Sequence, residues 1–271
     1  MDTVLYLLFL GAVVFTIVAQ IKVNRTFKKY SAVRASSGLT GSDAARLVLY
    51  SSGIAGVQIA PVSGSLTDNY NPQTNTISLS EDVYGAYSVA AAGVAAHEAG
   101  HACQHAADYY PLRIRNLLVP VCNFTSKLTF PLLLIGMLLT YFNEYIGVRV
   151  MMVAVAAYAV AVVFQIITLP VEFDASKRAM AALSGSGRYT PDELAGAKKV
   201  LSAAALTYVA AMSVSLLQLL RLLLMVSGRR RGREEKRRAH RAQTLSEGPL
   251  CGYLRGLRTE RTDATEDIFR Y

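Results

Sequence analysis

The chain has 271 residues, of which 52% are apolar and only 17% are charged, whereas soluble domains usually carry about 25% charged residues. This composition excludes a disordered chain, a fibrous protein and a small disulfide-rich scaffold, and it disfavours an ordinary soluble enzyme. The three cysteines lie far apart and form neither a disulfide framework nor a cysteine zinc cluster, and the meaning of the net charge of +9 depends on where the basic residues lie.

Apolar residues gather in four blocks, each suited to a membrane-spanning helix, which needs about 20 residues. The first block, residues 4–20, carries no charge, and basic residues follow it rather than precede it. It therefore predicts a retained anchor at residues 1–21 with its N-terminus outside, rather than a cleaved signal peptide. The other three spans are predicted at residues 117–142, 148–170 and 201–227. The third block, unlike a soluble core helix, has no polar face.

Between the first two spans lies a more polar segment, residues 22–116. Residues 41–50 have the pattern of a short helix. Residues 57–62 and 75–80 have the pattern of short strands on either side of a stretch rich in Gly, Asp, Asn and Pro. The segment is therefore predicted to contain a small β element next to the membrane.

The most informative residues of this segment are His97, Glu98 and His101, which lie in an alanine-rich stretch compatible with a helix. Residues four apart lie one turn apart on the same face, so both histidines can bind one Zn²⁺ ion. Glu98 is rotated by about 100° from His97 and is placed to activate zinc-bound water as a general base. This is the HExxH pattern of zinc peptidases, and such polar residues in a packed helix are costly unless they bind something. It predicts a peptidase with one zinc ion per chain.

A catalytic zinc site usually has three protein ligands, so one ligand is missing from this pattern. His105 lies eight residues, or about 12 Å, along the helix from His97, which is too far to share the ion. His240 lies in the basic tail, and an alanine at position 107 excludes the metzincin spacing. Glu172 and Asp174 directly follow the third span, and the hairpin of spans two and three returns them to the membrane face of the histidines. A carboxylate from this segment is therefore expected to complete the site.

Three stretches at these residues resemble the neutral zinc metallopeptidase family of YugP-like membrane proteases, and they read YNPQTNTISLS (70–80), SVAAAGVAAHEAGHACQ (88–104) and LPVEFDASKRA (169–179). The resemblance includes the apolar blocks and extends over roughly residues 1–228. More distantly, the chain is similar to the membrane gluzincins of the HtpX and CAAX prenyl protease group, which carry HExxH on one helix and a glutamate ligand on a later one. This resemblance implies that Glu172 is the third ligand, on a helix within residues 171–200.

The chain departs from the gluzincin pattern at Ser176, where that group has aspartate. Asp174 therefore has two open roles, as a partner of the zinc ligands or as a structural residue. In gluzincins a strand edge beside the HExxH helix pairs with extended substrate. By this resemblance the substrate-binding candidates are Asn75, Thr76, Ile77 and Ser78, and the alternative is an ordinary core strand. The candidates for stabilising the transition state, with none preferred, are Arg178, Tyr189 and His105.

The basic residues favour a cytoplasmic catalytic side, because 13 Lys and Arg flank the spans there and the turn at residues 143–147 has none. The tail, residues 228–271, conflicts with this orientation, because four spans place its 12 Lys and Arg and 7 Asp and Glu on the other side. Three alternatives would resolve the conflict. The fourth block does not fully cross the membrane, the orientation is inverted, or the tail is an exception to the charge rule. We interpret the tail as disordered and in contact with anionic lipid headgroups.

Together these features predict a mainly α, multi-pass protein of the cell membrane, with a gluzincin-like HExxH zinc helix and a small β element in a catalytic domain near the membrane. The expected activity is a zinc-dependent endopeptidase that cleaves membrane-associated or membrane-proximal polypeptides. One alternative is a non-proteolytic membrane protein with a structural zinc site, which would not need Glu98. A nucleic-acid or anionic-lipid binder would rest on the tail alone, and because no nucleic-acid-binding fold is recognisable, no nucleic-acid partner is expected.

Overall fold

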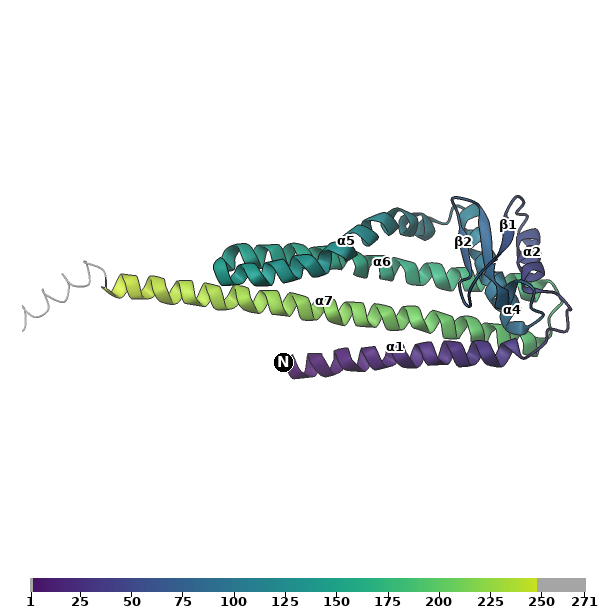
Figure 1. The fold of residues 1–271 in the computed structure, drawn as a ribbon, viewed down its shortest axis with the longest axis horizontal. Helices are drawn as coiled ribbons and strands as arrows, with labels where there is room; N and C mark the ends of the chain where they lie inside the picture. Colours follow the sequence, from purple (N-terminus) through teal and green to yellow (C-terminus); the bar gives the residue numbers. More distant parts are fainter. Residues whose placement is uncertain (1, 248–271) are drawn as a thin grey trace, which may run out of the picture.

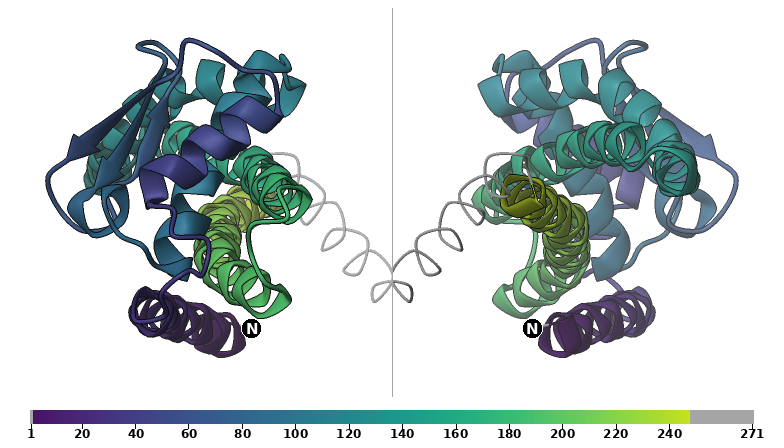
Figure 2. Two further views of the ribbon diagram at one scale, coloured as in Figure 1. Left: turned by 90° about the vertical axis from the view of Figure 1, so that its right-hand side faces the viewer. Right: turned by 90° about the vertical axis from the view of Figure 1, so that its left-hand side faces the viewer.

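The computed structural model describes residues 2–247, and the protein is built mainly of helices (Figure 1). Four helices are long: α1 (Asp2–Ser31), α5 (Tyr110–Phe142), α6 (Glu144–Gly185) and α7 (Pro191–Glu247). The shorter elements are α2 (Gly41–Ser51), β1 (Gln58–Val62), β2 (Asn69–Asn71), β3 (Thr76–Ser80), α3 (Glu81–Tyr84) and α4 (Val89–Ala106). Figures 1 and 2 show the long helices side by side, with the short elements gathered at one end of the bundle.

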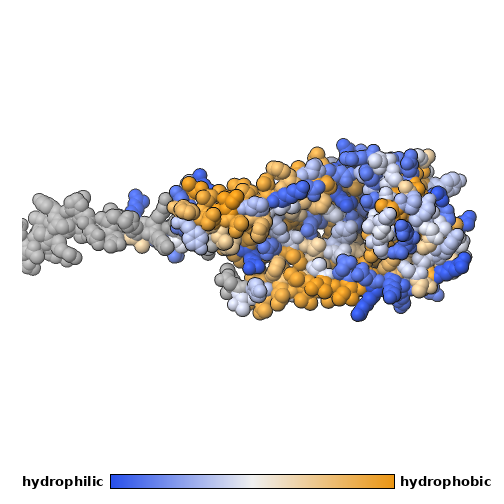
Figure 3. Space-filling model, viewed as in Figure 1, coloured by the Kyte–Doolittle hydropathy of each residue, from blue (hydrophilic) through white to orange (hydrophobic). Residues whose placement is uncertain are grey.

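Each of the four long helices contains a stretch that is long and apolar enough to cross a membrane. The four apolar blocks of the sequence lie in these helices. Little of their apolar surface is buried inside the protein. Figure 3 shows this apolar surface along the bundle and a mostly polar surface at the end that holds the short elements. The protein is therefore membrane-associated, with its small mixed α/β part at one end of the apolar bundle.

Helices α5 and α6 form a tight hairpin that returns the chain to the polar end. Only Asn143 separates them, and its side chain accepts hydrogen bonds from the backbone N–H groups of Tyr145 and Ile146. A side chain at Gly136 would collide with Met151, so a glycine lets the two helices approach closely. Pro120 and Pro131 lie inside α5, whose axis changes direction along its length, as expected where proline removes backbone hydrogen bonds (Figure 1).

Helix α4 is buried on almost every side, because it packs against α2, α6 and α7. The Ser88 side chain caps its N-terminus by accepting a hydrogen bond from Ala91 N–H. Alanine and glycine residues line the helix, and a methyl group at Gly100 would collide with the backbone carbonyl of Ala175 on α6. The backbones of α4 and α6 therefore touch, which fixes their separation next to Glu172.

The three strands form one sheet in the order β1-β3-β2, with β1 parallel and β2 antiparallel to β3. Strand β3 is therefore the central strand, and its residues Ile77 and Leu79 are completely buried. This corrects the expectation that residues 75–78 offer free main-chain groups to a substrate, because both edges of β3 are already paired. Strand β3 is therefore an ordinary core strand, which was the alternative. Strands β1 and β2 are the two edge strands of the sheet.

Two helices continue past the boundaries expected from the sequence. Helix α6 runs through Pro170 to Gly185, and α7 begins at Pro191, so residues 171–200 form two helical segments rather than one. Helix α7 then continues to Glu247, whereas residues 228–247 were expected to be disordered. Arg, Lys, Glu and Ala are strong helix formers, and they make up most of residues 229–241. The remainder of the predicted tail, residues 248–271, lies outside the described residues.

Candidate active site

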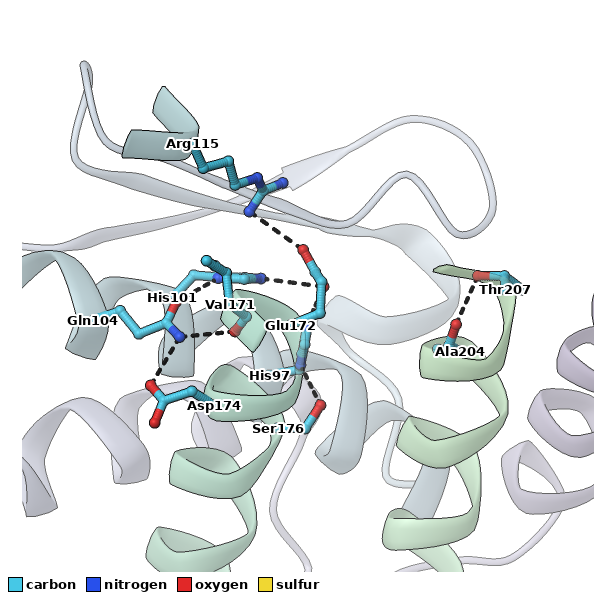
Figure 4. Close-up of polar contacts among 10 residues, drawn as sticks. All are labelled: His97, His101, Gln104, Arg115, Val171, Glu172, Asp174, Ser176, Ala204 and Thr207. Atoms are coloured by element: carbon cyan, nitrogen blue, oxygen red, sulfur yellow. Dashed lines mark hydrogen bonds and ion pairs between the residues drawn. The ribbon is translucent and has the colours of Figure 1, made fainter. Parts of the chain in front are cut away.

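Helix α4 brings two histidine rings to one side of the helix. His97 and His101 lie one turn apart, with ring centroids 4.7 Å apart and planes at 81° to each other. Both rings turn their Nε2 atoms toward the same carboxylate, that of Glu172 on α6 (Figure 4). The helical spacing thus orients two imidazole nitrogens toward one point, as the sequence predicts.

Glu172 completes this cluster from a helix 75 residues further along the chain. Its Oε2 atom lies 3.3 Å from His97 Nε2 and 3.7 Å from His101 Nε2, and only 3% of the residue is exposed. Ligand atoms of the three residues all lie within 4.8 Å of one another, an arrangement that could hold a metal ion. The structure therefore brings together the three residues predicted to bind zinc, and the hairpin of α5 and α6 is what places the third.

Gln104, which is completely buried, determines how His101 is protonated. The Gln104 amide nitrogen donates to Val171 O at 2.8 Å and to Asp174 Oδ2 at 2.9 Å. Its oxygen must then accept from His101 Nδ1, which lies 3.0 Å away. With the proton on Nδ1, the lone pair of His101 Nε2 faces Glu172 and is available to a cation.

Ser176 holds the other ring in the same way. Its Oγ atom lies 3.0 Å from His97 Nδ1, and Ser176 follows Glu172 by one turn of α6 (Figure 4). When Nε2 of His97 binds a cation, Nδ1 carries the proton and its N–H donates a hydrogen bond to the serine oxygen. The position at which the chain departs from the gluzincin pattern is therefore still a histidine partner, with a hydroxyl in place of a carboxylate.

Arg115, from the first part of α5, contacts the outer oxygen of the third ligand. Its guanidinium lies 3.3 Å from Glu172 Oε1, while Oε2 faces the histidines. The carboxylate is thus divided between an arginine on one side and two imidazoles on the other. The contact with Arg115 therefore orients the Glu172 carboxylate.

The electrostatics of the cluster favour a positive charge between the three ligands. Burial of the His101 ring lowers its pKa, but the interaction with the nearby Glu172 carboxylate and the charge of Glu98 outweigh this effect and raise the pKa above its usual value. A site that stabilises a proton on a buried imidazole also attracts a cation of similar charge. Two imidazoles and one carboxylate are ligands that Zn²⁺ accepts, so the residues fit this metal.

Glu98 lies next to the cluster without being part of it. It is 9% exposed and lines a cavity of about 270 Å³ together with His97 and Glu172. The three converging ligands do not include its carboxylate. Glu98 therefore faces a cavity beside the candidate metal ligands, as the rotation of about 100° along the helix predicts.

The other residues considered in the sequence serve elsewhere. Asp174 accepts hydrogen bonds from Gln104 and from Arg178. Because Gln104 contacts His101, Asp174 supports a candidate metal ligand indirectly. His105 is exposed, and its ring forms a hydrogen bond of 2.8 Å with the Tyr70 hydroxyl, a contact that joins α4 to β2. Tyr189 is buried in the hydrophobic core. None of the three candidates for stabilising the transition state is among the residues lining the cavity with Glu98.

The sequence interpretation missed three residues that the structure places at the site: Gln104, Arg115 and Tyr208. Gln104 follows His101 by three residues, and this helical spacing could have indicated a contact. In the sequence, Arg115 contributes only to the positive charge that flanks the second span. Tyr208 lies in the fourth apolar block, where it reads as part of a membrane span, yet it lines the cavity with Glu98. For Arg115 and Tyr208 no local pattern pointed to the site, because tertiary packing alone brings them there.

The Ser176 contact predicts a measurable change in metal affinity. We expect Ser176→Ala to weaken zinc binding by about tenfold or more, because His97 loses the partner that fixes its ring and its tautomer. The measurement is competition with a chromophoric zinc chelator in detergent. Ser184→Ala, two turns further along α6 and away from the histidines, is the matched control and should bind zinc like the unaltered protein. Equal affinities for the two variants would show that Ser176 does not support His97.

Comparison with known proteins is consistent with this site. The family model described as "Putative neutral zinc metallopeptidase" matches residues 5–227. The chain is also 46% identical over 212 residues to the "Putative membrane protease YugP" of Bacillus subtilis (strain 168), an alignment that covers 78% of this chain and 92% of the relative. No solved structure matches the chain. The family match contains all three candidate metal ligands and Glu98, and it ends just before the basic tail.

Proposed function

The chain belongs to the neutral zinc metallopeptidase family, and on this basis we propose that it is a membrane-embedded zinc endopeptidase with a gluzincin-like HExxH site. It would hydrolyse peptide bonds in membrane-associated or membrane-proximal proteins. The observation that carries this proposal is the convergence of His97, His101 and Glu172, two of which line the same cavity as Glu98. Zinc held by these three residues would supply a Lewis acid that polarises the scissile carbonyl and makes water more acidic.

The protein's own residues divide the remaining work. His97, His101 and Glu172 hold the ion, while Ser176, Gln104 and Arg115 hold those ligands in place. The Glu98 carboxylate accepts the proton of the attacking water and donates it to the nitrogen of the leaving amine. The low exposure of Glu98 limits competing water and strengthens its electrostatic interaction with the reacting groups.

Strand β2 is the best-placed element to bind extended substrate. It pairs with β3 on one side only, and the adjoining residues Leu66 and Asp68 line the cavity with Glu98. Substrate pairing would therefore use β2 rather than the central strand β3. Peptides N-methylated at one backbone amide at a time test this assignment. Strand pairing predicts that cleavage is blocked at alternate positions, whereas uniform tolerance of methylation would exclude it.

The place of the cavity supports substrates close to the membrane. Its lining includes Gln20 and Val23, at the end of the first apolar block, and Tyr208, within the fourth apolar block. The catalytic groups thus lie at the boundary between the apolar bundle and the polar end. A polypeptide anchored in the same membrane would reach them without leaving the lipid surface.

We also propose that the catalytic end faces the cytoplasm, because 13 Lys and Arg flank the spans at that end and the turn at residues 143–147 has none. Since α7 contains a full span, Cys251, which follows it, would then lie outside. A membrane-impermeant maleimide tests this in intact cells, with Tyr50→Cys in the exposed part of α2 as the second site. Labelling of the introduced cysteine but not of Cys251 would show the opposite orientation.

The peptidase proposal is tested by incubating the purified protein in detergent with casein and sequencing the products by mass spectrometry. An endopeptidase produces internal fragments with new termini at both ends. Release of single terminal residues only would contradict an endopeptidase. Zinc bound at one ion per chain with no cleavage of casein or of membrane-anchored peptides would favour the alternative, a non-proteolytic protein with structural zinc.

A further inference from the structure

A second cavity lies between α6 and α7. Its volume is about 670 Å³, which is within the range of ligand-binding pockets. Apolar side chains line most of it, including Phe173 and Met180 of α6 and Leu201, Leu206 and Val209 of α7. We call this cavity the α6–α7 groove. It is separate from the cavity that holds Glu98, although Ser176, Leu201 and Ala205 line both.

The groove crosses the boundary between apolar and polar parts of the helices. On α7 its lining extends from Leu194, before the fourth apolar block, to Val209, well inside it, which is about 22 Å along the helix. On α6 the lining begins at Phe173, just after the third apolar block, and extends away from the membrane to Ser184. One end of the groove thus lies at the depth of lipid tails and the other at the depth of headgroups or above.

Two lysines line the groove at the headgroup level. Lys177 lies one turn beyond Phe173 on α6, and Lys198 lies three residues before Leu201 on α7. Among the described residues, neither lysine has an ion-pair partner, although other basic residues such as Arg115 and Arg178 do. Two exposed positive charges therefore lie directly above an apolar channel that continues into the membrane.

We propose that the α6–α7 groove binds one anionic phospholipid. Its phosphate would contact Lys177 and Lys198, and an acyl chain would lie along Leu201, Leu206 and Val209. The distribution of charge favours a lipid. Its anionic headgroup matches the two lysines, and its apolar tail matches the apolar part of the groove. Lysine stems also pack on apolar surface while their ammonium groups reach toward the lipid phosphates. A free anion would leave the apolar part uncovered, and an apolar polypeptide segment would leave both lysines without a counter-charge.

The absence of tryptophan from the chain makes the groove accessible to fluorescence. Phe173→Trp introduces a single reporter at a half-exposed position in the groove, and Leu206→Trp gives a second reporter deeper in it. Phe130→Trp, on the lipid-facing surface of α5, reports the bulk lipid. Each variant is reconstituted in phosphatidylcholine vesicles that contain a low fixed fraction of brominated phosphatidylglycerol or brominated phosphatidylcholine. Bromine quenches tryptophan only at close range.

We expect the brominated anionic lipid to be enriched roughly tenfold at both groove reporters relative to the Phe130→Trp reporter, because each lysine near the surface favours anionic lipid. Lys177→Gln/Lys198→Gln should abolish the enrichment. Arg188→Gln/Lys199→Gln removes the same charge from neighbouring exposed positions outside the groove and should leave it intact. Added glycerol phosphate should not relieve the quenching, since it lacks the acyl chains.

Three results would overturn the proposal. One is equal quenching by both brominated lipids at the groove reporters, and another is enrichment that survives Lys177→Gln/Lys198→Gln. The third is relief of quenching by an apolar transmembrane peptide, which would assign the groove to a polypeptide segment. The readout is fluorescence and not cleavage, so the result does not depend on the proposed peptidase activity.

Discussion

Glu98→Gln is expected to lower peptide hydrolysis by about a hundredfold or more while leaving one zinc ion bound per chain. The glutamine side chain has nearly the same shape as glutamate, but it cannot accept a proton from water at neutral pH. General base catalysis contributes roughly 10²–10⁴-fold to rates, which sets the expected size of the loss. Zinc binding should persist because the Glu98 carboxylate is not among the three converging ligands.

The measurement compares initial rates of cleavage of one peptide with the zinc content of the same samples. Glu81→Gln is the matched control, because Glu81 is exposed at the start of α3 and does not line the cavity. The control should retain both activity and zinc. A Glu98→Gln variant that cleaves as fast as the control would contradict the role of Glu98 as general base, and one without zinc would place Glu98 among the ligands.

Glu172→Gln is expected to weaken zinc binding by more than a hundredfold, which exceeds the 10- to 100-fold cost typical of losing a ligand's hydrogen-bonding partner. The substitution keeps the side-chain volume at a position that is 3% exposed, but it removes the negative charge from the site. It also leaves Arg115 facing a neutral amide, which adds an unbalanced positive charge close to the cation. Both effects oppose the binding of Zn²⁺.

Asp174→Asn is the appropriate comparison, because it removes the same charge two residues away on the same helix. Asp174 contacts Gln104 and Arg178 rather than the cluster itself, so its loss should cost far less affinity. Titration against a zinc chelator of known affinity measures both variants. If Asp174→Asn lost more zinc than Glu172→Gln, Asp174 would be the third ligand and the assignment of Glu172 would be wrong.

The parts of the structure that follow from local pattern were predictable from the sequence. Helical periodicity places His97 and His101 on one face without any knowledge of the tertiary fold. Uninterrupted apolar composition locates the four long helices, and the short turn around residue 143 implies that the hairpin returns Glu172 to the side of the histidines. These inferences depend on spacing along the chain, and the structure confirms that the three candidate ligands meet.

Helix ends, strand order and the partners of the metal ligands depend on tertiary packing, which no local sequence pattern indicates. Apolar composition marks where a helix meets lipid and not where the helix ends, so the continuation of α6 beyond Pro170 and of α7 beyond residue 227 was not foreseen. Strand order in a sheet is set by long-range pairing, so the sequence left open whether β3 is an edge strand or an ordinary core strand. Arg115 reaches Glu172 only because the first part of α5 lies beside the part of α6 that carries Glu172. Partners of catalytic ligands are therefore the part of such a site that sequence reasoning recovers least well.

The most direct test of a zinc-dependent endopeptidase is to remove the metal from the purified protein and restore it, with casein cleavage followed throughout. The site predicts about one zinc ion per chain, loss of cleavage when a chelator removes that ion, and recovery of cleavage when one equivalent of zinc is returned. Glu98→Gln carried through the same cycle should lose and regain zinc without cleaving at any stage. Cleavage that continues unchanged in the zinc-free protein would contradict the account.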